Sequence, residues 1–421
     1  MDILEKKILK EVDQLRDEII DFAYSLISQP SVLGQEASVL EKMEEKLSAL
    51  SFHTVRVPII PAELNKKQGF APVPWSYEDR YNLVATCHSG GQGGRSALLN
   101  GHLDVVSPEP IHQWENHPFD PTIKGGWLYG RGSGDMKSGI AAMVYAVYAI
   151  RKAGFQFQGP VTIESVIEEE CSGNGTLACF YAGYDADAVL IPEPFGPVIL
   201  THQVGVLWFK VTVQGIPAHV KETRAGVNAI EKSYDLIKAL RALEAEMNQE
   251  IHPAFKHIEH PLNLNIGIIS GGDWPSTVPA KAEFHGRISY YPGKTYQEVQ
   301  QKMIQTIETA SRNDAWLSQN PPIVEFYGFR SDGFSLDRNL PAFDVLDRCH
   351  QELTGNKADE FIATCTTDLR VFNLFGKGQA TCFGPIAKNI HGANECVNLD
   401  SVIQVAKTYA LFLSRWCGII D

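Results

Sequence analysis

Residues 96–106 read SALLNGHLDVV, an apolar run that ends in a histidine and an aspartate. The run is typical of a buried β-strand, and strand side chains two residues apart point to the same side. We therefore expect His102 and Asp104 to lie together at the end of a strand, where open α/β sheets build their sites. A carboxylate beside a metal-bound imidazole fixes its tautomer and raises its basicity. A surface histidine before a turn aspartate would give the same letters, so this motif alone does not decide the function.

Strands and helices alternate on both sides of this run. Helices are predicted at residues 1–28, 36–50 and 137–153. Strands are predicted at residues 53–60, 81–87, 96–106, 160–167 and 188–191. This order predicts an α/β layer with a largely parallel central sheet. We interpret residues 61–78, which contain several prolines and aromatics, as a surface loop.

The middle of the chain has a different pattern. Its predicted elements are strand 206–213, helix 226–247, strands 262–269 and 281–290, helix 296–312 and strand 323–327. The order β-α-β-β-α-β is that of a ferredoxin-like unit. From about residue 341 the pattern returns to helix, strand and a last helix at 399–417. The sequence therefore predicts a catalytic domain made of residues 1–202 and 329–421, interrupted by an inserted domain at 203–328.

The composition indicates a globular protein without a nucleic-acid or membrane partner. Asp and Glu (50) outnumber Lys and Arg (37), and the net charge of -13 would repel a phosphate backbone. No apolar run reaches membrane-spanning length and the N-terminus lacks a signal-peptide apolar region, so we expect a cytoplasmic protein. The eight cysteines include no CxxC pair, which favours buried thiols over a thiolate zinc site or a disulfide framework.

A glycine-rich turn, GRGSGDMK at residues 130–137, precedes a predicted helix. A phosphate-binding loop is excluded because Met136 stands before Lys137 where the Walker pattern requires glycine, and the dinucleotide spacing fails too. The glycines would instead allow the backbone to approach a metal centre closely. Asp135 is suited to metal binding, to capping the helix, or to both.

Carboxylates and a histidine also follow the other predicted strands. Glu168, Glu169 and Glu170 come directly after one strand, and three adjacent carboxylates repel each other unless a cation offsets them. An exposed acidic loop is the alternative, although the buried-looking strand before them disfavours it. Glu193 ends the next strand, and His391 lies in a loop after a later one. Two histidines, one aspartate and two glutamates suit a pair of zinc ions, with Glu169 left over as a base; cobalt or manganese would also fit.

The sequence resembles the co-catalytic zinc family that contains acetylornithine deacetylase, succinyl-diaminopimelate desuccinylase, aminoacylase and glutamate carboxypeptidase. The similarity runs from about Ile19 to the C-terminus and is nearest to the deacetylase and desuccinylase branch. The motifs that carry it are GHLDVV, GRGSGDMKSG, EEECSGNG, PEP, GIPAH, and GP followed by HGANE. The resemblance implies a zinc-dependent exopeptidase-like α/β domain with an inserted lid.

The resemblance also implies a ligand set for two metal ions. His102, Asp135 and Glu193 would hold one ion. Asp135, Glu170 and His391 would hold the other, so that Asp135 bridges the pair. The peptide bond that follows Asp135 would be cis.

Three further residues receive roles from the same resemblance. Asp104 would orient His102, and Glu169 would activate the water between the metal ions. His219 of the GIPAH motif matches a histidine that reaches the active site of the partner subunit in this family. The lid would then form the interface of a homodimer.

The sequence departs from the family in the region expected to face the substrate. Many relatives have an arginine just before a Pro-Gly turn to bind a substrate carboxylate, and the aligned residue here is Ser289. Arg287 lies two positions earlier on the same strand face and is a candidate replacement. Trp274 and Thr277 stand in a lid segment expected to face the substrate, and the tryptophan suggests an apolar or aromatic substrate group.

These observations predict hydrolysis of the amide bond in a small N-acylated amine or amino acid. A dipeptidase or carboxypeptidase on the same metal centre is an alternative, for which Arg287 is the discriminating residue. Removal of a formyl or acetyl group from a non-amino-acid amine, such as a pyrimidine, is another. A non-catalytic binding protein on a hydrolase fold is the alternative from a different class, but such a protein is expected to have lost a ligand or the base.

Overall fold

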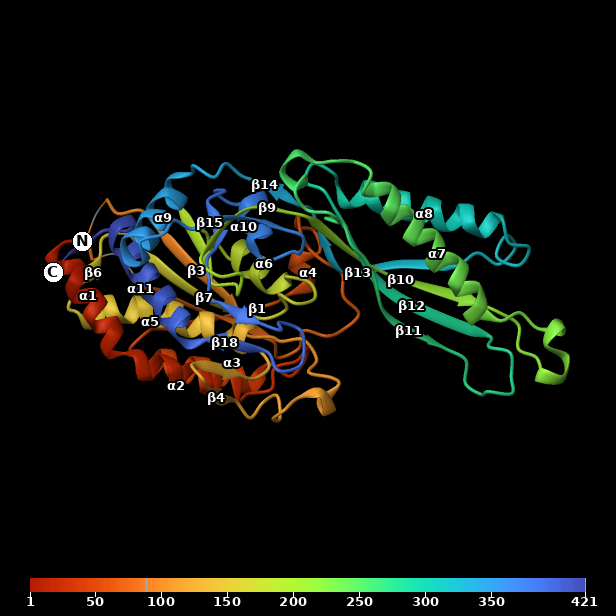
Figure 1. Ribbon diagram of the computed structural model, residues 1–421, viewed down its shortest axis with the longest axis horizontal. Helices are drawn as coiled ribbons and strands as arrows, with labels where there is room; N and C mark the ends of the chain where they lie inside the picture. The colour runs from red at the N-terminus through yellow and green to blue at the C-terminus, as the bar shows by residue number, and fades with distance from the viewer. Residues whose placement is uncertain (88–89, 92, 421) are drawn as a thin grey trace.

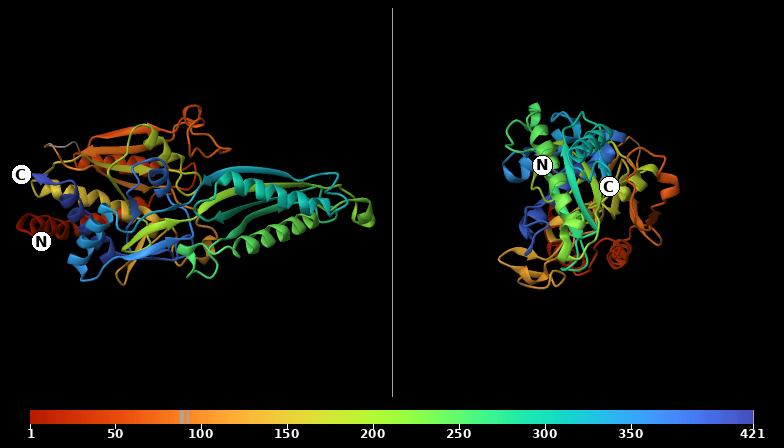
Figure 2. Two further views of the ribbon diagram at one scale, coloured as in Figure 1. Left: turned by 90° about the horizontal axis from the view of Figure 1, so that it is seen from above. Right: turned by 90° about the vertical axis from the view of Figure 1, so that its right-hand side faces the viewer.

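The computed structural model describes residues 1–87, 90–91 and 93–420. Figure 1 shows a broad domain that contains both termini and an elongated domain that extends from it. The chain enters the elongated domain after β9 (Val198–Gln203) and returns along β13 (Ile323–Ser331). A second view confirms that the elongated domain projects from one side (Figure 2).

The catalytic domain is built on a six-stranded sheet with the order β1-β2-β7-β3-β8-β16. Neighbouring strands from β7 to β16 are parallel, whereas β1 and β2 are added antiparallel at one edge. The strands are β1 (Thr54–Pro58), β2 (Tyr81–Cys87), β3 (Ala97–His102), β7 (Val161–Val166), β8 (Ala188–Ile191) and β16 (Ala380–Cys382). The parallel strands therefore bring their carboxyl ends to one edge of the sheet.

Helices cover both faces of this sheet. On β3, a Cβ at Gly101 would meet Ile140 of α5, whereas the adjacent Asn100 contacts Thr176 of α6. Consecutive strand residues point to opposite faces, so α5 and α6 lie on opposite sides. The helices are α1 (Ile3–Gln14), α2 (Arg16–Ile27), α3 (Ala37–Ala49), α4 (Pro61–Leu64), α5 (Ser138–Lys152), α6 (Asn174–Tyr181), α9 (Pro341–Thr354), α10 (Leu369–Phe375) and α11 (Leu399–Trp416).

Three small sheets complete the catalytic domain, with the orders β14-β9-β15, β17-β18-β5-β4 and β19-β6. Their strands, apart from β9, are β4 (Thr122–Lys124), β5 (Trp127–Tyr129), β6 (Gln156–Phe157), β14 (Phe334–Ser335), β15 (Asp359–Ala363), β17 (Ala387–Lys388), β18 (Cys396–Asn398) and β19 (Ile419–Ile420). The pairing of β18 with β5 matters for the site. It places the loop that carries His391 beside the glycine-rich turn that carries Asp135.

The elongated domain, here called the lid, is a four-stranded antiparallel sheet with the order β11-β12-β10-β13. Two helices pack on one face of it and on each other, around a separate apolar cluster that includes Phe209, Phe284 and Met303. The elements are β10 (Gly205–Gln214), α7 (Ala229–Met247), β11 (Leu264–Gly271), β12 (Lys281–Tyr290), α8 (Tyr296–Arg312) and β13. The predicted ferredoxin-like insertion is present, while its boundaries at residues 203 and 328 stay a prediction.

Two local predictions were wrong. The N-terminal helix is divided at Leu15, where the chain bends so that apolar residues of both α1 and α2, Val12 and Phe22 among them, join one core. Residues 61–78 are not simply a surface loop, because Phe70 and Tyr77 are buried in them. The physical reason is the buried carboxylate of Glu168, which accepts hydrogen bonds from Trp75, Tyr77 and Arg80.

Most of the cysteines are buried, as expected from the sequence. All eight cysteines are free thiols, and six of them are buried. Among the helices of the described residues, none is both long and apolar enough to cross a membrane.

Candidate metal centre

Six titratable side chains converge at the carboxyl edge of the parallel sheet. Two pairs of neighbouring strands, β3 with β7 and β3 with β8, bring their ends together there. We call the six side chains the metal-site cluster: His102, Asp135, Glu169, Glu170, Glu193 and His391. The sequence had placed each of them at a strand end or in an adjacent loop, and the fold brings all of them together.

Asp135 lies between the two histidines. Its Oδ1 is 3.0 Å from Nε2 of His102, and its Oδ2 is 3.3 Å from Nε2 of His391. The two oxygens of one carboxylate therefore face two different imidazoles, which is the arrangement a bridging ligand needs. Asp135 does not cap α5, because Lys137 occupies the cap position and the helix has no side-chain cap. The peptide bond after Asp135 is cis, as the resemblance implied.

The two ends of the cluster are each completed by a glutamate. Around His102, oxygens of Glu169 and Glu193 both lie 4.0 Å from Nε2. Around His391, Oε1 of Glu170 lies 3.1 Å from Nε2. Groups with ligand atoms within 4.8 Å of one another are His102 with Asp135 and Glu170, and His102 with Glu169 and Glu193.

The electrostatics of the cluster also fit divalent cations. Burial raises the pKa of Glu169 and of Glu193 well above the usual range, and neighbouring carboxylates raise both further. The charge of Glu170 raises the pKa of His391 to about 11. Burying several carboxylates together is unfavourable without positive charge nearby, and bound metal ions supply such charge. The residues present therefore fit a pair of divalent metal ions.

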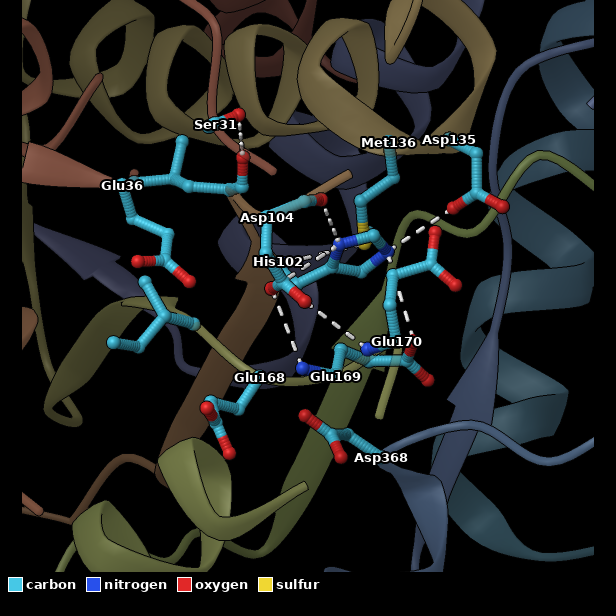
Figure 3. Close-up of polar contacts among 12 residues, drawn as sticks. Ser31, Glu36, His102, Asp104, Asp135, Met136, Glu168, Glu169, Glu170 and Asp368 are labelled. Carbon is cyan, nitrogen blue, oxygen red and sulfur yellow. Dashed lines mark hydrogen bonds and ion pairs between the residues drawn. The ribbon is translucent and has the colours of Figure 1, made fainter. Parts of the chain in front are cut away.

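Asp104 orients His102 differently from our expectation. Nδ1 of His102 lies 2.9 Å from the backbone carbonyl of Asp104, whereas the carboxylate is 3.7 Å away. That carboxylate instead accepts hydrogen bonds from the backbone N–H groups of Glu169 and Glu170, at 3.3 and 3.1 Å. Asp104 thus aligns both the imidazole and the turn that carries the two glutamates (Figure 3). Burial raises the pKa of Asp104 to about 7.

A buried ion pair that the sequence analysis missed fixes the Asp135 turn. Arg131 donates to Glu395, and both side chains are almost completely buried. The carboxylate of Glu395 also accepts the backbone N–H groups of Gly132, Gly134 and Asp135. The signal was present, since Glu395 ends the HGANE motif, but the motif does not say which residue it meets.

The lid residues named from the sequence do not join the cluster within one chain. His219 is exposed and forms an isolated β-bridge with Thr277, and Trp274 is 68% exposed. The adjoining turn Val220–Ala225 lies at the end of the lid farthest from the catalytic domain (Figures 1 and 2). The prediction that Trp274 and Thr277 face the substrate is therefore not met by their own chain, because the lid is extended.

Arg287 is placed differently from these three residues. It lies on β12 opposite Trp208 of β10 and Asn265 of β11. Its Nε and Nη2 are buried without a hydrogen-bond partner among the described residues. Burial and the charge of Glu193 raise the pKa of the Cys365 thiol to about 12, while the charge of Arg287 lowers that pKa. The thiol therefore lies within electrostatic range of both Glu193 and Arg287. Ser289, the aligned residue, is fully buried and accepts from the N–H of Asn263, so it is not available to a substrate.

The geometry agrees with comparisons to known proteins. The profile of the peptidase family M20/M25/M40 matches residues 98–415. The chain belongs to this family. An N-formyl-4-amino-5-aminomethyl-2-methylpyrimidine deformylase from Bacillus subtilis is 26% identical over 436 residues, covering 97% of each chain. The deformylase of the same name from Halalkalibacterium halodurans is 24% identical over 432 residues, covering 98% of this chain and 97% of its own.

The fold is also found in solved structures of the family. The di-peptidase Dug1p from Saccharomyces cerevisiae has a TM-score of 0.77 at 15% identity and covers 98% of both chains. At that identity the likeness shows the fold alone. With the family matches and the metal-site cluster, the chain is a metal-dependent hydrolase of amide bonds. The acetylornithine deacetylase branch is not singled out by these matches.

Proposed function

We propose that this protein removes a small acyl group from an N-acylated amine by two-metal amide hydrolysis. The observation that carries the proposal is the position of Asp135, whose two oxygens face His102 and His391, with an oxygen of Glu169 4.0 Å from Nε2 of His102. A bridging carboxylate with a nearby spare glutamate is what hydrolysis by two metal ions requires. Among the described residues, Glu169 is the one that we assign as the base.

His102, Asp135 and Glu193 would hold one ion, and Asp135, Glu170 and His391 the other. Such ions, when bound, lower the pKa of a bound water to about 7 and polarise the amide carbonyl. We assign zinc first, with cobalt and manganese as alternatives of similar ligand preference.

Glu169 is placed to accept the proton of the attacking water and to return it to the leaving amine. Its side chain is buried, which shields the proton from bulk water between these two steps. The carboxylate of Asp104 holds the backbone of Glu169 in place by accepting a hydrogen bond from the Glu169 N–H. His219 would come from the lid of a second copy and donate to the developing oxyanion.

The acyl group is proposed to be formyl or acetyl. Support comes from the two relatives of nearly equal length that are named as deformylases of an aminomethylpyrimidine. Aromatic side chains lie where the lid meets the catalytic domain: Trp208 packs edge-on against Tyr327 and Phe329, and the guanidinium of Arg370 lies over the Phe329 ring. Aromatic faces of this kind suit a flat heterocyclic amine.

A dipeptidase or carboxypeptidase activity is the second candidate, and Arg287 is the observation that favours it. A guanidinium with two buried nitrogens and no described partner is suited to a carboxylate, which accepts two parallel hydrogen bonds from it. The two candidates differ in whether the substrate carries that carboxylate.

The test is a substrate panel. The protein is dialysed against a chelator, reconstituted separately with zinc, cobalt or manganese, and assayed on three substrate classes. These are N-formyl-4-amino-5-aminomethyl-2-methylpyrimidine, N-acetyl amino acids and dipeptides. We expect the formyl or acetyl substrates to give the highest kcat/KM. Preference for dipeptides would support the second candidate, and binding without any turnover would favour a non-catalytic protein.

A further inference from the structure

Glu168 is the first of three consecutive glutamates, but it does not join the metal-site cluster. Its side chain is fully buried and lies on the opposite side of the turn from Asp135 (Figure 3). Its neighbours Glu169 and Glu170 face the cluster from the same turn. A buried carboxylate directly beside the base and a ligand, with no ligand role of its own, requires an explanation.

Every acceptor position of the Glu168 carboxylate is used. Its Oε1 accepts from Nε1 of Trp75 at 2.7 Å and from Nη1 of Arg80 at 2.6 Å. Its Oε2 accepts from the hydroxyls of Tyr77 at 2.6 Å and of Ser172. A carboxylate with four donors, one of them charged, is held in a single orientation.

The backbone of Glu168 shapes the turn as well. Its φ is +74°, in the left-handed region that non-glycine residues rarely adopt and that surrounding contacts must maintain. Its carbonyl accepts from the N–H groups of Ser172 and Gly173, at 3.0 and 2.7 Å. With the Asp104 carboxylate on the N–H groups of Glu169 and Glu170, the turn is fixed from both sides.

Three of the four donors come from residues 69–80, which we call the strap. Within it, Trp75, Tyr77 and Arg80 reach Glu168, and Arg80 also pairs with the buried Glu36. At its other end the strap is fixed to the lid strand β13. The carbonyl of Pro72 accepts from the N–H of Gly328 at 2.8 Å, and that of Phe70 accepts from Arg330 at 2.7 Å. The strap is therefore an anchored support and not a free loop.

We propose that Glu168 is a positioning residue, which uses the strap to hold Glu169 and Glu170 at the distances that proton transfer and metal binding need. The proposal rests on the function proposed above, since it assigns Glu169 as the base. Residues behind a metal site commonly change activity by about 10–100-fold when they are replaced. Two substitutions remove single parts of this support: Tyr77→Phe and Glu168→Gln.

The experiment compares these variants with a matched control, Tyr181→Phe. The Tyr181 hydroxyl donates to the Gln68 carbonyl, directly before the strap, so the control removes the same group without touching Glu168. The assay uses the zinc-reconstituted full chain and N-formyl-4-amino-5-aminomethyl-2-methylpyrimidine. Metal content, the thermal unfolding midpoint and amide hydrogen exchange of residues 168–173 are measured beside kcat and KM.

We expect kcat to fall about tenfold in Tyr77→Phe and on the order of a hundredfold in Glu168→Gln, with KM nearly unchanged. Exchange at Ser172 and Gly173 should accelerate, while the control matches the wild type. Unchanged kcat and exchange in both variants, or an equal loss in the control, would overturn the proposal. So would a lower unfolding midpoint with normal kcat per folded molecule. If the wild type hydrolyses none of the formyl or acetyl substrates of the panel, the proposed function fails, whereas the exchange comparison still decides whether Glu168 holds the turn.

Discussion

The two domains differ most in the charges that they bury. Among the described residues, the lid buries one Asp, Glu, Lys or Arg side chain, Glu244, and the catalytic domain buries eleven. These are Glu36, Asp104, Arg131, Lys137, Glu164, Glu168, Glu169, Glu193, Asp368, Arg370 and Glu395. Burying a charge is costly unless a partner or a metal ion offsets it. The catalytic domain therefore holds its proposed reactive groups in its interior, whereas the interior of the lid is almost entirely apolar.

The comparison teaches where each function can be located. The metal-site cluster is complete within one catalytic domain, because all its members come from that domain. Of the functional candidates of the lid, His219 and Trp274 are instead exposed, and the turn Val220–Ala225 beside His219 lies at the end of the lid farthest from the catalytic domain (Figure 1). We therefore propose that metal binding needs one chain, and that full activity needs two. The following predictions test the two halves of this statement, from the largest expected effect on turnover to the smallest.

The largest effect is expected from Glu169→Gln. This substitution leaves the proposed ligands intact, so both metal ions should remain while kcat falls by between about a hundredfold and ten-thousandfold. Glu170→Gln removes a charge that faces His391, so metal content should fall and added metal should restore part of the activity. Metal analysis by mass spectrometry beside steady-state rates separates the two.

Two outcomes would contradict the roles assigned to Glu169 and Glu170. A Glu169→Gln protein that keeps most of its turnover would show that another group is the base. Near-normal activity in both variants would mean that the three glutamates form only an acidic loop, which the burial of Glu168 and Glu169 argues against.

His219→Ala should lower kcat on the order of a hundredfold, the usual effect of losing one oxyanion donor, with metal content unchanged. Mixing it with Glu169→Gln tests whether the histidine acts in trans. Each mixed dimer contains one site with both an intact base and an intact partner histidine. Random reassortment should therefore restore about a quarter of the wild-type rate.

The neighbouring exposed Lys221 provides the control for this experiment. Lys221→Ala lies on the same tip and should leave kcat unchanged. A fully active monomer in sedimentation, or a mixture no faster than its components, would remove the homodimer and the trans role of His219 together.

Arg287→Met should have a smaller effect that depends on the substrate. Losing a charged hydrogen bond to a carboxylate costs about 1.5–3 kcal/mol, which is roughly tenfold or more in KM for N-acyl amino acids or dipeptides. The formylated pyrimidine has no carboxylate, so its KM should hardly change and serves as the internal control. Equal losses on both substrate classes would show that Arg287 supports the lid and does not select the substrate.

Much of the fold was predictable because its signals are local. The apolar strands and amphipathic helices were located to within a few residues, and parallel strands place their carboxyl ends at one edge. The metal-site cluster followed from this rule together with the family motifs. The contact between Asp104 and His102 could not be predicted in this way. Whether the imidazole meets the carbonyl or the carboxylate of Asp104 depends on which backbone N–H groups lie opposite that carboxylate.

The strap was missed for a related reason. Its prolines and aromatics are typical of a loop, and nothing in residues 61–78 indicates the buried Glu168 about ninety positions later. The glutamates themselves did not differ in the sequence either, and only the family resemblance assigned separate roles to Glu169 and Glu170. In the structure, Glu168 has a left-handed backbone and its carboxylate is held away from the cluster by Trp75, Tyr77 and Arg80. Long-range partners of single polar groups are therefore the part of this site that sequence patterns do not contain.

The last prediction concerns stability, and turnover should hardly change. Glu164 on β7 is fully buried, and one of its oxygens accepts from Asn100 while the other has no partner among the described residues. Burial, with a smaller contribution from the charge of Asp368, raises the pKa of Glu164 from 4.5 to about 8. The folded state therefore holds a proton that the unfolded state releases between about pH 4.5 and pH 8.

Because its folded pKa is raised, Glu164 contributes stability that is fully present below pH 4.5 and is lost as the pH rises through about 8. Glu164→Gln resembles the protonated side chain at every pH. Its free energy of unfolding should match that of the wild type near pH 5 and exceed it by on the order of 2–4 kcal/mol near pH 9. Denaturant unfolding of the metal-saturated proteins at both pH values measures this difference. Glu246→Gln, an exposed change on the lid, should show no such dependence on pH. If the Glu164 variant and the wild type lose stability in parallel, the buried charge of the catalytic domain is not what makes that domain sensitive to pH.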